Sequence, residues 1–190
     1  MYNTEEYIKL IKETLSPYRF NHSICVAKRA KELAEKHGID EEKAYVAGIL
    51  HDITKEMPND EQIKLIEENG HKLAYYEAGN HRIFHQMSGE AYVKNVLKIA
   101  DKDILSGIRY HTTGRENMTL FEMIIYLADF TSADRNYPDV DIMREKTDKN
   151  LLDGMLYSLQ YTIKDVVSKG RILHPDTLSC YNWTIKELSG

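Results

Sequence analysis

The segment Ala47-Gly48-Ile49-Leu50-His51-Asp52-Ile53-Thr54-Lys55 ends a helical stretch on an imidazole that is followed directly by a carboxylate. The stretch begins at Asp40, where acidic residues favour a helix N-terminus. Its apolar residues recur with helical spacing, and His51 continues their stripe, so the pattern turns this side chain toward the interior. An imidazole and a carboxylate on an inward face are costly unless they are paired or ligated. The segment therefore predicts a functional site at the end of a buried helix.

Four further polar side chains lie on apolar helical stripes in other parts of the chain. They are His22, His85, His111 and Asp129. A single inward histidine is more often a hydrogen-bonded core residue than a metal ligand. Several such residues converging from different helices of a bundle can instead bind a divalent cation. Because the donors are nitrogen and oxygen without thiolate, the set suits iron, manganese, cobalt or zinc.

Helical periodicity dominates the whole chain, and strand alternation is nearly absent. The predicted helices are Thr4–Leu15, one that Asn21 or Ser23 caps and that ends before Gly38, Asp40–Leu50, one around Ile63 that ends at Asn69-Gly70, His85–Ala100, Asp101–Tyr110, Thr119–Phe130 and Leu151–Lys169. The tail from His174 is expected to be a loop with one short turn of helix. Residues 1–190 are therefore expected to form one all-α bundle.

The composition is that of a globular protein and argues against several classes. The chain has 190 residues, of which 42% are hydrophobic, and a net charge of −5. A chain of this length can bury a core without a structural metal. Its negative net charge argues against extended electrostatic binding to a nucleic-acid backbone. No apolar run is long enough to span a bilayer, and the N-terminus does not resemble a signal peptide. Cys25 and Cys180 are far apart, which indicates a reducing compartment and a cytoplasmic location.

The segment around His51 resembles the AGLLHD-x-x-K core of HD-domain phosphohydrolases. With His22 before this segment and Asp129 after it, the order of residues is similar to the H…HD…D pattern of those enzymes. Nearly the whole chain is similar to the YqeK family of symmetrical bis(5′-nucleosyl)-tetraphosphatases. The matching pieces are Arg19-Phe20-Asn21-His22-Ser23, the segment around His51, His85-Gln86-Met87-Ser88-Gly89-Glu90-Ala91, Tyr110-His111-Thr112-Thr113-Gly114-Arg115, Ile125-Tyr126-Leu127-Ala128-Asp129-Phe130, Arg135-Asn136-Tyr137-Pro138 and the tail from His174. The chain departs from that family before Arg135, where Ala133-Asp134 stands and a Glu-Pro pair is usual.

The resemblance implies an HD-domain helical bundle that hydrolyses diadenosine tetraphosphate to two ADP molecules. It also implies a divalent metal, with iron favoured over manganese, cobalt or zinc. The residues implied as ligands of the main metal are His22, His51, Asp52 and Asp129. His85 and His111 are implied to hold a second metal or to contact phosphate. His81 is the alternative to His85, because the chain is atypical between Asn80 and Ser88.

The reaction of that family also predicts residues that act on the substrate, because a polyphosphate needs charge neutralisation in the transition state. The expected catalytic residues are Asp52, Lys55, His85, His111 and Arg135. The expected substrate-binding residues are Arg19, Ser23, Lys55, Thr113, Arg115, Arg135, Thr177, Tyr181 and Asn182. A solvated surface charge is the alternative for Lys55, Arg115 and Arg135, and it fits Arg115 better than the other two. A packed C-terminal loop is the alternative for Thr177, Tyr181 and Asn182.

Two other functions fit the same residues. One is another HD-type nucleotide phosphohydrolase or phosphodiesterase, and the other is a non-catalytic nucleotide-binding sensor. The segment Tyr110–Arg115 favours the tetraphosphatase. The expected partners are a dinucleoside polyphosphate or ADP and a second copy of the chain in a homodimer, without nucleic acid or membrane.

Overall fold

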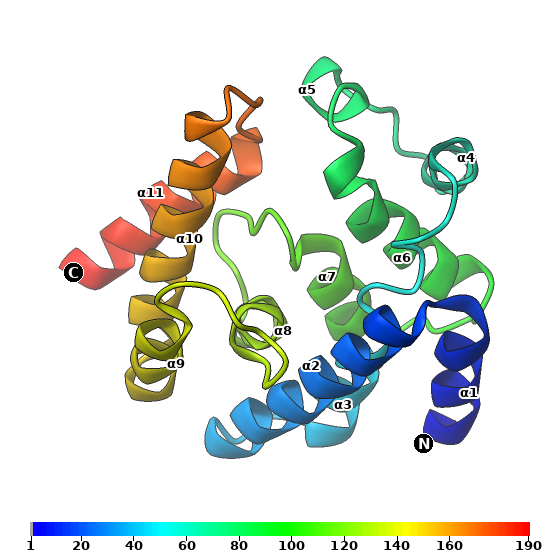
Figure 1. Cartoon of the computed structure of the whole chain (residues 1–190), viewed down its shortest axis with the longest axis horizontal. Coiled ribbons are helices and arrows are strands. Elements are labelled where there is room, and N and C mark those ends of the chain that lie inside the picture. Colours follow the sequence, from blue (N-terminus) through cyan, green and yellow to red (C-terminus); the bar gives the residue numbers. More distant parts are fainter. Residues whose placement is uncertain (1) are drawn as a thin grey trace.

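The computed structural model describes residues 2–190, and every regular element within that range is helical, which confirms the all-α prediction. No helix in that range is both long and apolar enough to cross a bilayer. The elements are α1 (Thr4–Thr14), α2 (Pro17–Lys36), α3 (Glu41–Leu50), α4 (Asn59–Glu68), α5 (Tyr75–Ala78), the 3-10 turn η1 (His81–Ile83), α6 (Phe84–Asn95), α7 (Lys102–Tyr110), α8 (Leu120–Thr131), α9 (Val140–Lys149), α10 (Leu151–Ser168) and α11 (Pro175–Ser189) (Figure 1).

Helix α2 begins earlier than the sequence predicted. The Ser16 side chain accepts a hydrogen bond from the backbone N–H of Arg19 at 3.3 Å, and Pro17 occupies the first turn. Serine at the cap followed by proline is a favourable helix start, because proline has no N–H to leave unpaired there. Asn21 and Ser23, which were expected as caps, lie inside the helix. The prediction of a later start was wrong, and the additional turn brings Arg19 into the helix.

Helices α2 and α3 touch backbone to backbone. A Cβ atom added to Gly48 would lie 2.5 Å from the Cα of Ala27 and 2.8 Å from its nitrogen. Only glycine permits this approach, since real Cβ atoms do not come so close to a neighbouring backbone. The contact fixes the C-terminal end of α3, where His51 and Asp52 follow, against the side of α2.

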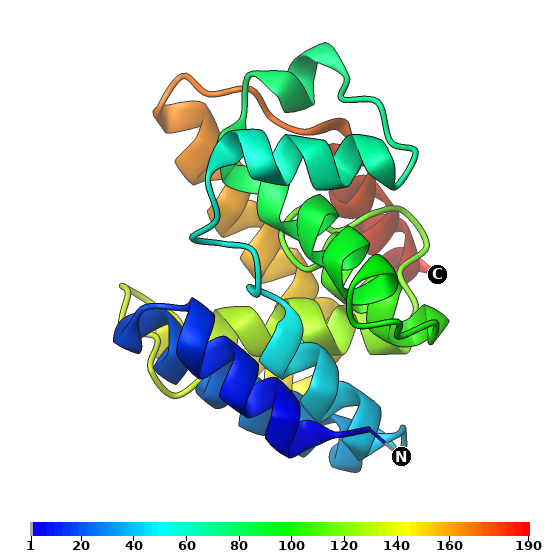
Figure 2. The same ribbon diagram turned by 90° about the vertical axis from the view of Figure 1, so that its right-hand side faces the viewer.

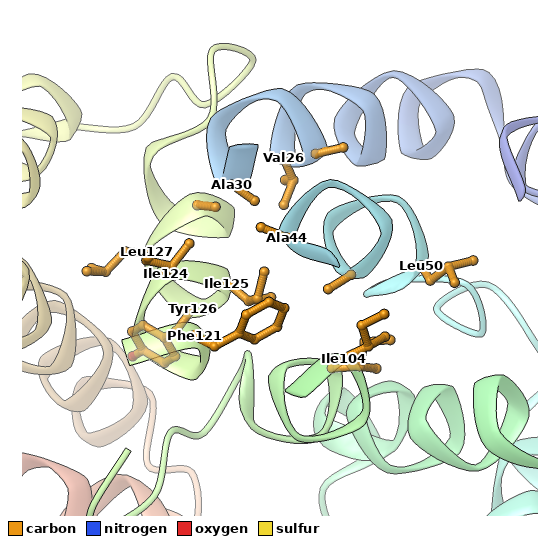
Figure 3. Close-up of a cluster of buried hydrophobic side chains, with 14 of the residues drawn as sticks. Val26, Ala30, Ala44, Leu50, Ile104, Phe121, Ile124, Ile125, Tyr126 and Leu127 are labelled. Carbon is orange, nitrogen blue, oxygen red and sulfur yellow. The ribbon is translucent and has the colours of Figure 1, made fainter. Parts of the chain in front are cut away.

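The apolar core lies between α2, α3, α7 and α8. Figure 3 shows side chains from all four helices meeting there, among them Val26, Ala44, Ile104 and Ile125, each of which is fully buried. Burying one large aliphatic side chain contributes about 1.5–3 kcal/mol. The small side chains of α2 and α3 at this contact allow the short distance between the two helices. The core therefore holds the helix ends that carry the inward polar residues.

The remaining helices cover this core from two sides. Helices α10 and α11 pack on one another and α10 packs on α8, whereas α4 packs on α6 through a separate apolar cluster (Figures 1 and 2). That cluster contains Ile66 of α4, Ile83 of η1, and Phe84 and Met87 of α6. The segment between α4 and α6 is thus held by its own small core.

Helix α6 ends at Asn95 and not at Ala100, so the longer helix predicted from the sequence was wrong. Lys98 has φ 58, in the left-handed region, and the N–H of Ile99 donates to the carbonyl oxygen of Val93 at 3.1 Å. Lys98 lies two residues beyond the helix C-cap, Val96, in a conformation that glycine adopts more readily than other residues. Because this residue is a lysine, the sequence has no glycine there to mark the end of the helix.

The tail was also predicted wrongly, because it forms the 15-residue helix α11. His174 caps it, with its Nδ1 atom accepting the N–H of Asp176 at 3.1 Å, and Pro175 occupies the first turn. Cys180 and Trp183 face inward. Helices α5 and α9 were likewise not predicted, because their sequences are short or strongly polar.

We expect Gly48→Ala to lower the free energy of unfolding by about 2 kcal/mol, because an overpacked backbone contact costs roughly 1–3 kcal/mol. Urea denaturation measures this change. The matched control is Gly79→Ala, since Gly79 has φ −83 and an added Cβ meets nothing nearer than 3.8 Å. The control should change stability by less than about 1 kcal/mol. Equal stability of the two variants would contradict the role of Gly48.

Candidate metal centre

Six imidazole and carboxylate side chains from five parts of the chain meet at one place. His22 comes from α2, His51 and Asp52 follow α3, His85 comes from α6, His111 follows α7, and Asp129 comes from α8. Five of them are at most 2% exposed, and the side chain of Asp129 is 17% exposed. The structure thus brings together all six residues that the helical stripes had singled out.

The first group of possible ligand atoms is formed by His22, His51 and Asp129, whose atoms lie within 4.8 Å of one another. The Oδ1 atom of Asp129 is 3.0 Å from Nε2 of His22 and 4.0 Å from Nε2 of His51. The Oδ2 atom of Asp52 lies 3.6 Å from Nε2 of His51. Two imidazoles and two carboxylates therefore surround one small volume.

A second group lies on the other side of Asp52. Its Oδ1 atom is 3.4 Å from Nε2 of His85 and 3.7 Å from Nε2 of His111. The two Nε2 atoms are 3.0 Å apart. His81, the alternative considered for this position, is exposed, so it is His85 that reaches the centre. The two oxygens of one carboxylate thus face two different sets of imidazoles.

Backbone carbonyl groups orient two of the histidines. Nδ1 of His51 donates to the carbonyl oxygen of Gly48 at 2.7 Å, and Nδ1 of His111 donates to that of Ile108 at 2.7 Å. Each bond places the ring proton on Nδ1 and leaves a lone pair on Nε2, as a metal-bound histidine requires. Both acceptors are carbonyl groups three residues back, at the end of a helix where such groups lack a helical partner.

A carboxylate that the sequence analysis did not assign orients the third histidine. Nδ1 of His22 donates to Oδ2 of Asp134 at 2.8 Å, and the hydroxyl of Ser132 donates to the other Asp134 oxygen at 2.7 Å. Asp134 stands where the related family usually has a Glu-Pro pair. This departure from the family pattern was the sequence signal that could have identified Asp134, because a carboxylate at this position can accept the hydrogen bond from His22.

Two buried atoms test whether these residues fit a cation. Nε2 of His51 and Oδ1 of Asp52 are both buried and have no hydrogen-bond partner within residues 2–190. Buried polar atoms nearly always have a partner. A divalent cation would satisfy both atoms, and its ligands would be of the nitrogen and oxygen type that iron, manganese, cobalt and zinc accept. The donor set therefore fits a metal centre.

The electrostatic environment keeps most of these groups in the form that binds metal. Burial opposes ionisation of Asp52, yet Lys55 and His51 hold its pKa well below the usual range. Burial lowers the pKa of His51 to about 4 and also lowers that of His85. Burial also disfavours charge on His22, but hydrogen bonds to the two neighbouring carboxylates raise its pKa to about 9, and that proton is one a metal would displace.

Comparisons with known proteins agree with this geometry. The profile of the HD domain family matches residues 19–134, which contain all six residues. A protein of Bacillus subtilis (strain 168) named bis(5′-nucleosyl)-tetraphosphatase, symmetrical, is 35% identical over 186 residues, covering 96% of this chain and 98% of its own. This chain belongs to the HD-domain family of symmetrical bis(5′-nucleosyl)-tetraphosphatases. A protein of the same name from Halalkalibacterium halodurans is 36% identical, covering 97% of this chain and 98% of its own.

The fold of this HD domain is also found in a solved structure. A crystal structure from Clostridium acetobutylicum, described as a predicted HD superfamily hydrolase involved in NAD metabolism, superimposes with a TM-score of 0.95. It is 35% identical and the match covers 98% of this chain and 99% of that one. The HD-domain bundle expected from the sequence is thereby confirmed.

Three cations lie against the carboxylates of this HD domain. The guanidinium of Arg19 donates to Oδ2 of Asp52 at 2.8 Å, and Nζ of Lys55 lies 3.7 Å from Oδ1 of the same residue. Arg135 pairs with the carboxylate of Asp129 and donates to its backbone oxygen at 2.7 Å. The three side chains are 20%, 30% and 27% exposed, so an anionic ligand can reach them.

The other residues predicted to bind substrate lie in several environments. Ser23 is fully buried and its hydroxyl has no partner within residues 2–190, whereas Thr113 is buried against Gln86. Arg115 pairs with Glu122 at 2.9 Å and contacts none of the six central residues. Arg115 is therefore ion-paired and not simply a solvated surface charge, and its role toward the substrate stays a prediction.

The tail residues also differ from one another. Thr177 is 3% exposed and lines a cleft beside Thr112. Tyr181 packs against the main apolar core, and Asn182 is exposed. Thr177 therefore lies at a cleft, whereas Tyr181 belongs to the surroundings of the core.

We expect Asp134→Ala to weaken binding of Mn²⁺ by roughly 10–100-fold, the usual effect of losing the acceptor behind a ligating histidine. Isothermal titration calorimetry of the metal-free chain measures the affinity. Asp134→Asn is the matched control, because its amide oxygen can still accept the Nδ1–H of His22 and should preserve most of the affinity. Unchanged affinity in Asp134→Ala would show that Asp134 does not support the site.

Proposed function

We propose that this chain carries out the reaction for which its relatives are named, the symmetrical hydrolysis of a dinucleoside tetraphosphate, and that diadenosine tetraphosphate is its substrate. The observation that carries the proposal is the buried carboxylate of Asp52. Its two oxygens face separate imidazole groups, and two cations, Arg19 and Lys55, lie beside it. A site that combines ligands for cations with accessible positive charge suits a polyphosphate.

The residues proposed to hold the main cation are His22, His51, Asp52 and Asp129, and those proposed for a second cation are His85 and His111. We propose iron, since mixed histidine and carboxylate sets are typical of non-haem iron, although the same donors accept manganese, cobalt or zinc. A bound divalent cation neutralises charge on phosphate oxygens and makes a water molecule more acidic. The cytoplasmic location and the homodimer expected from the sequence stay predictions.

The chain's own cations would position the polyphosphate. Lys55 lies 2.9 Å from Nε2 of His85, so it can neutralise phosphate oxygens held beside that imidazole. Arg19 and Arg135 lie against the two carboxylates and would face the phosphates from the other side of the centre. Asp52 cannot supply a proton near neutral pH, because its pKa is held well below the usual range. The reaction therefore suits a leaving group such as ADP, which needs little proton donation.

We expect Arg135→Lys to lower kcat/KM for diadenosine tetraphosphate by about ten-fold, since lysine loses the planar fork that contacts two acceptors at once. The metal content per chain should stay unchanged. Steady-state kinetics and metal analysis measure the two quantities. Arg29→Lys is the matched control, because Arg29 pairs with Asp148 and contacts none of the six central residues. Unchanged kinetics in Arg135→Lys would reject its role.

Product analysis in water labelled with heavy oxygen tests the proposed function. Full-length protein purified without air and loaded with iron or manganese should convert diadenosine tetraphosphate to ADP alone. One of the two ADP molecules should carry the label, because a single central cut adds one water-derived oxygen. Asp52→Ala should abolish turnover. ATP with AMP as products would contradict the central cut, and nucleotide binding without turnover would indicate a sensor.

A further inference from the structure

Two clefts lie beside the metal centre. One, here called the α10 cleft, has a volume of about 190 Å³ and lies between α10, the start of α11 and the Thr112-Thr113 pair. The other, here called the α4 cleft, has a volume of about 390 Å³ and lies between the start of α4 and the turn η1. In Figure 1, α4 and α10 lie on either side of α5. Sites for drug-sized ligands measure roughly 300–1,000 Å³, so a dinucleoside tetraphosphate needs more than one of these clefts.

The α4 cleft borders the imidazole of His85 directly, and the α10 cleft approaches it through Thr112. Lys55 and His85 line the α4 cleft. Thr112 lines the α10 cleft, and its hydroxyl is 3.0 Å from Nε2 of His85. Arg82 lines both clefts. A phosphate chain can therefore run from one cleft past His85 into the other, with Arg82 beside its path.

The walls of the two clefts differ in chemistry. Ile83, Val166, Ile172 and Leu173 form an apolar part of the α10 cleft wall, and the other lining residues are polar or charged, among them Asp165, Arg171 and Thr177. An apolar patch next to polar groups suits a flat ring system such as a nucleobase. The α4 cleft is lined mainly by polar and charged side chains, which suits a ribose and its phosphates.

Three donors on the wall of the α4 cleft have no protein partner. The side chains of Asn59, His81 and Arg82 are exposed and make no hydrogen bond or ion pair with any other residue of the range 2–190. They come from two separate elements, α4 and η1, and line the same cleft. Arg82 is unpaired, unlike the three cations of the centre, which all lie against carboxylates. These free groups are available to a polar, anionic ligand.

We infer that the α4 cleft binds the second nucleotide half of the substrate, the one that departs as ADP, and that Asn59, His81 and Arg82 are its binding residues. The α10 cleft then holds the first nucleoside. This inference rests on the proposed function. It makes the α4 cleft the part of the protein that prefers a substrate with two nucleoside ends over one with a single end.

The test compares two substrates and two variants of the metal-loaded, full-length protein. Diadenosine tetraphosphate has a second nucleoside, whereas adenosine 5′-tetraphosphate does not and gives ADP and pyrophosphate after the same cut. Asn59→Trp places a bulky ring in the α4 cleft from an exposed position. Asp60→Trp is the matched control, since Asp60 is the next residue, is also exposed and does not line the cleft.

Asn59→Trp should lower kcat/KM for diadenosine tetraphosphate by about ten-fold, chiefly through KM, because a clash is an effective way to reject a ligand. For adenosine 5′-tetraphosphate, kcat/KM should change less than about two-fold. Asp60→Trp should behave as wild type, and all variants should keep their melting temperature and metal content. If Asn59→Trp lowered kcat/KM equally for both substrates, or for neither, the inference would be overturned. Absence of turnover by the wild type would instead refute the proposed function, and the inference would fall with it.

Discussion

The rest of the site depends on one buried carboxylate. Asp52 is 2% exposed and lies where α2, α3, α6, α7 and α8 meet. An ionised carboxylate in such a place is stable only with charged or hydrogen-bonding partners. Arg19 and Lys55 supply positive charge, and imidazoles approach both oxygens. Moving these partners away would leave the negative charge of Asp52 without compensation, so the surrounding helices are held in one arrangement. In that arrangement their imidazoles and carboxylates form a donor set for cations.

The scaffold positions the histidines through backbone geometry. His51 and His111 each follow the last residue of a short helix and bond back to a carbonyl group of its final turn. The same bond satisfies an orphan helix carbonyl and fixes the ring. The close approach of α2 to α3 at Gly48 then sets the distance between the histidines of those two helices. Ring orientation and helix packing are therefore determined by the same few contacts.

The surroundings of the centre explain how one chain can serve a symmetrical substrate with an asymmetric site. The two halves of a dinucleoside tetraphosphate are identical, but the α10 cleft and the α4 cleft are not. The α10 cleft has an apolar patch on its wall, whereas the α4 cleft is lined mainly by polar and charged side chains. A central cut requires only that the phosphate chain be held with its midpoint at the centre. Unequal clefts can do this if each accepts one half, and the cations of the centre hold the charge between them.

The sequence by itself determined the helical fold and the inward-facing polar residues, because both follow from apolar spacing along single helices. The six residues were identified one stripe at a time, and their chain order matched a known family. The sequence could not show that Asp134 accepts a hydrogen bond from His22, because a contact between residues 112 positions apart leaves no periodic signal. The sequence also did not show that α6 ends at Asn95, because the left-handed residue after this helix is a lysine, Lys98, and not a glycine. Only the tertiary structure decided that Arg115 pairs with Glu122 and that Arg82 lies free between two clefts, since such pairing depends on which helices pack together.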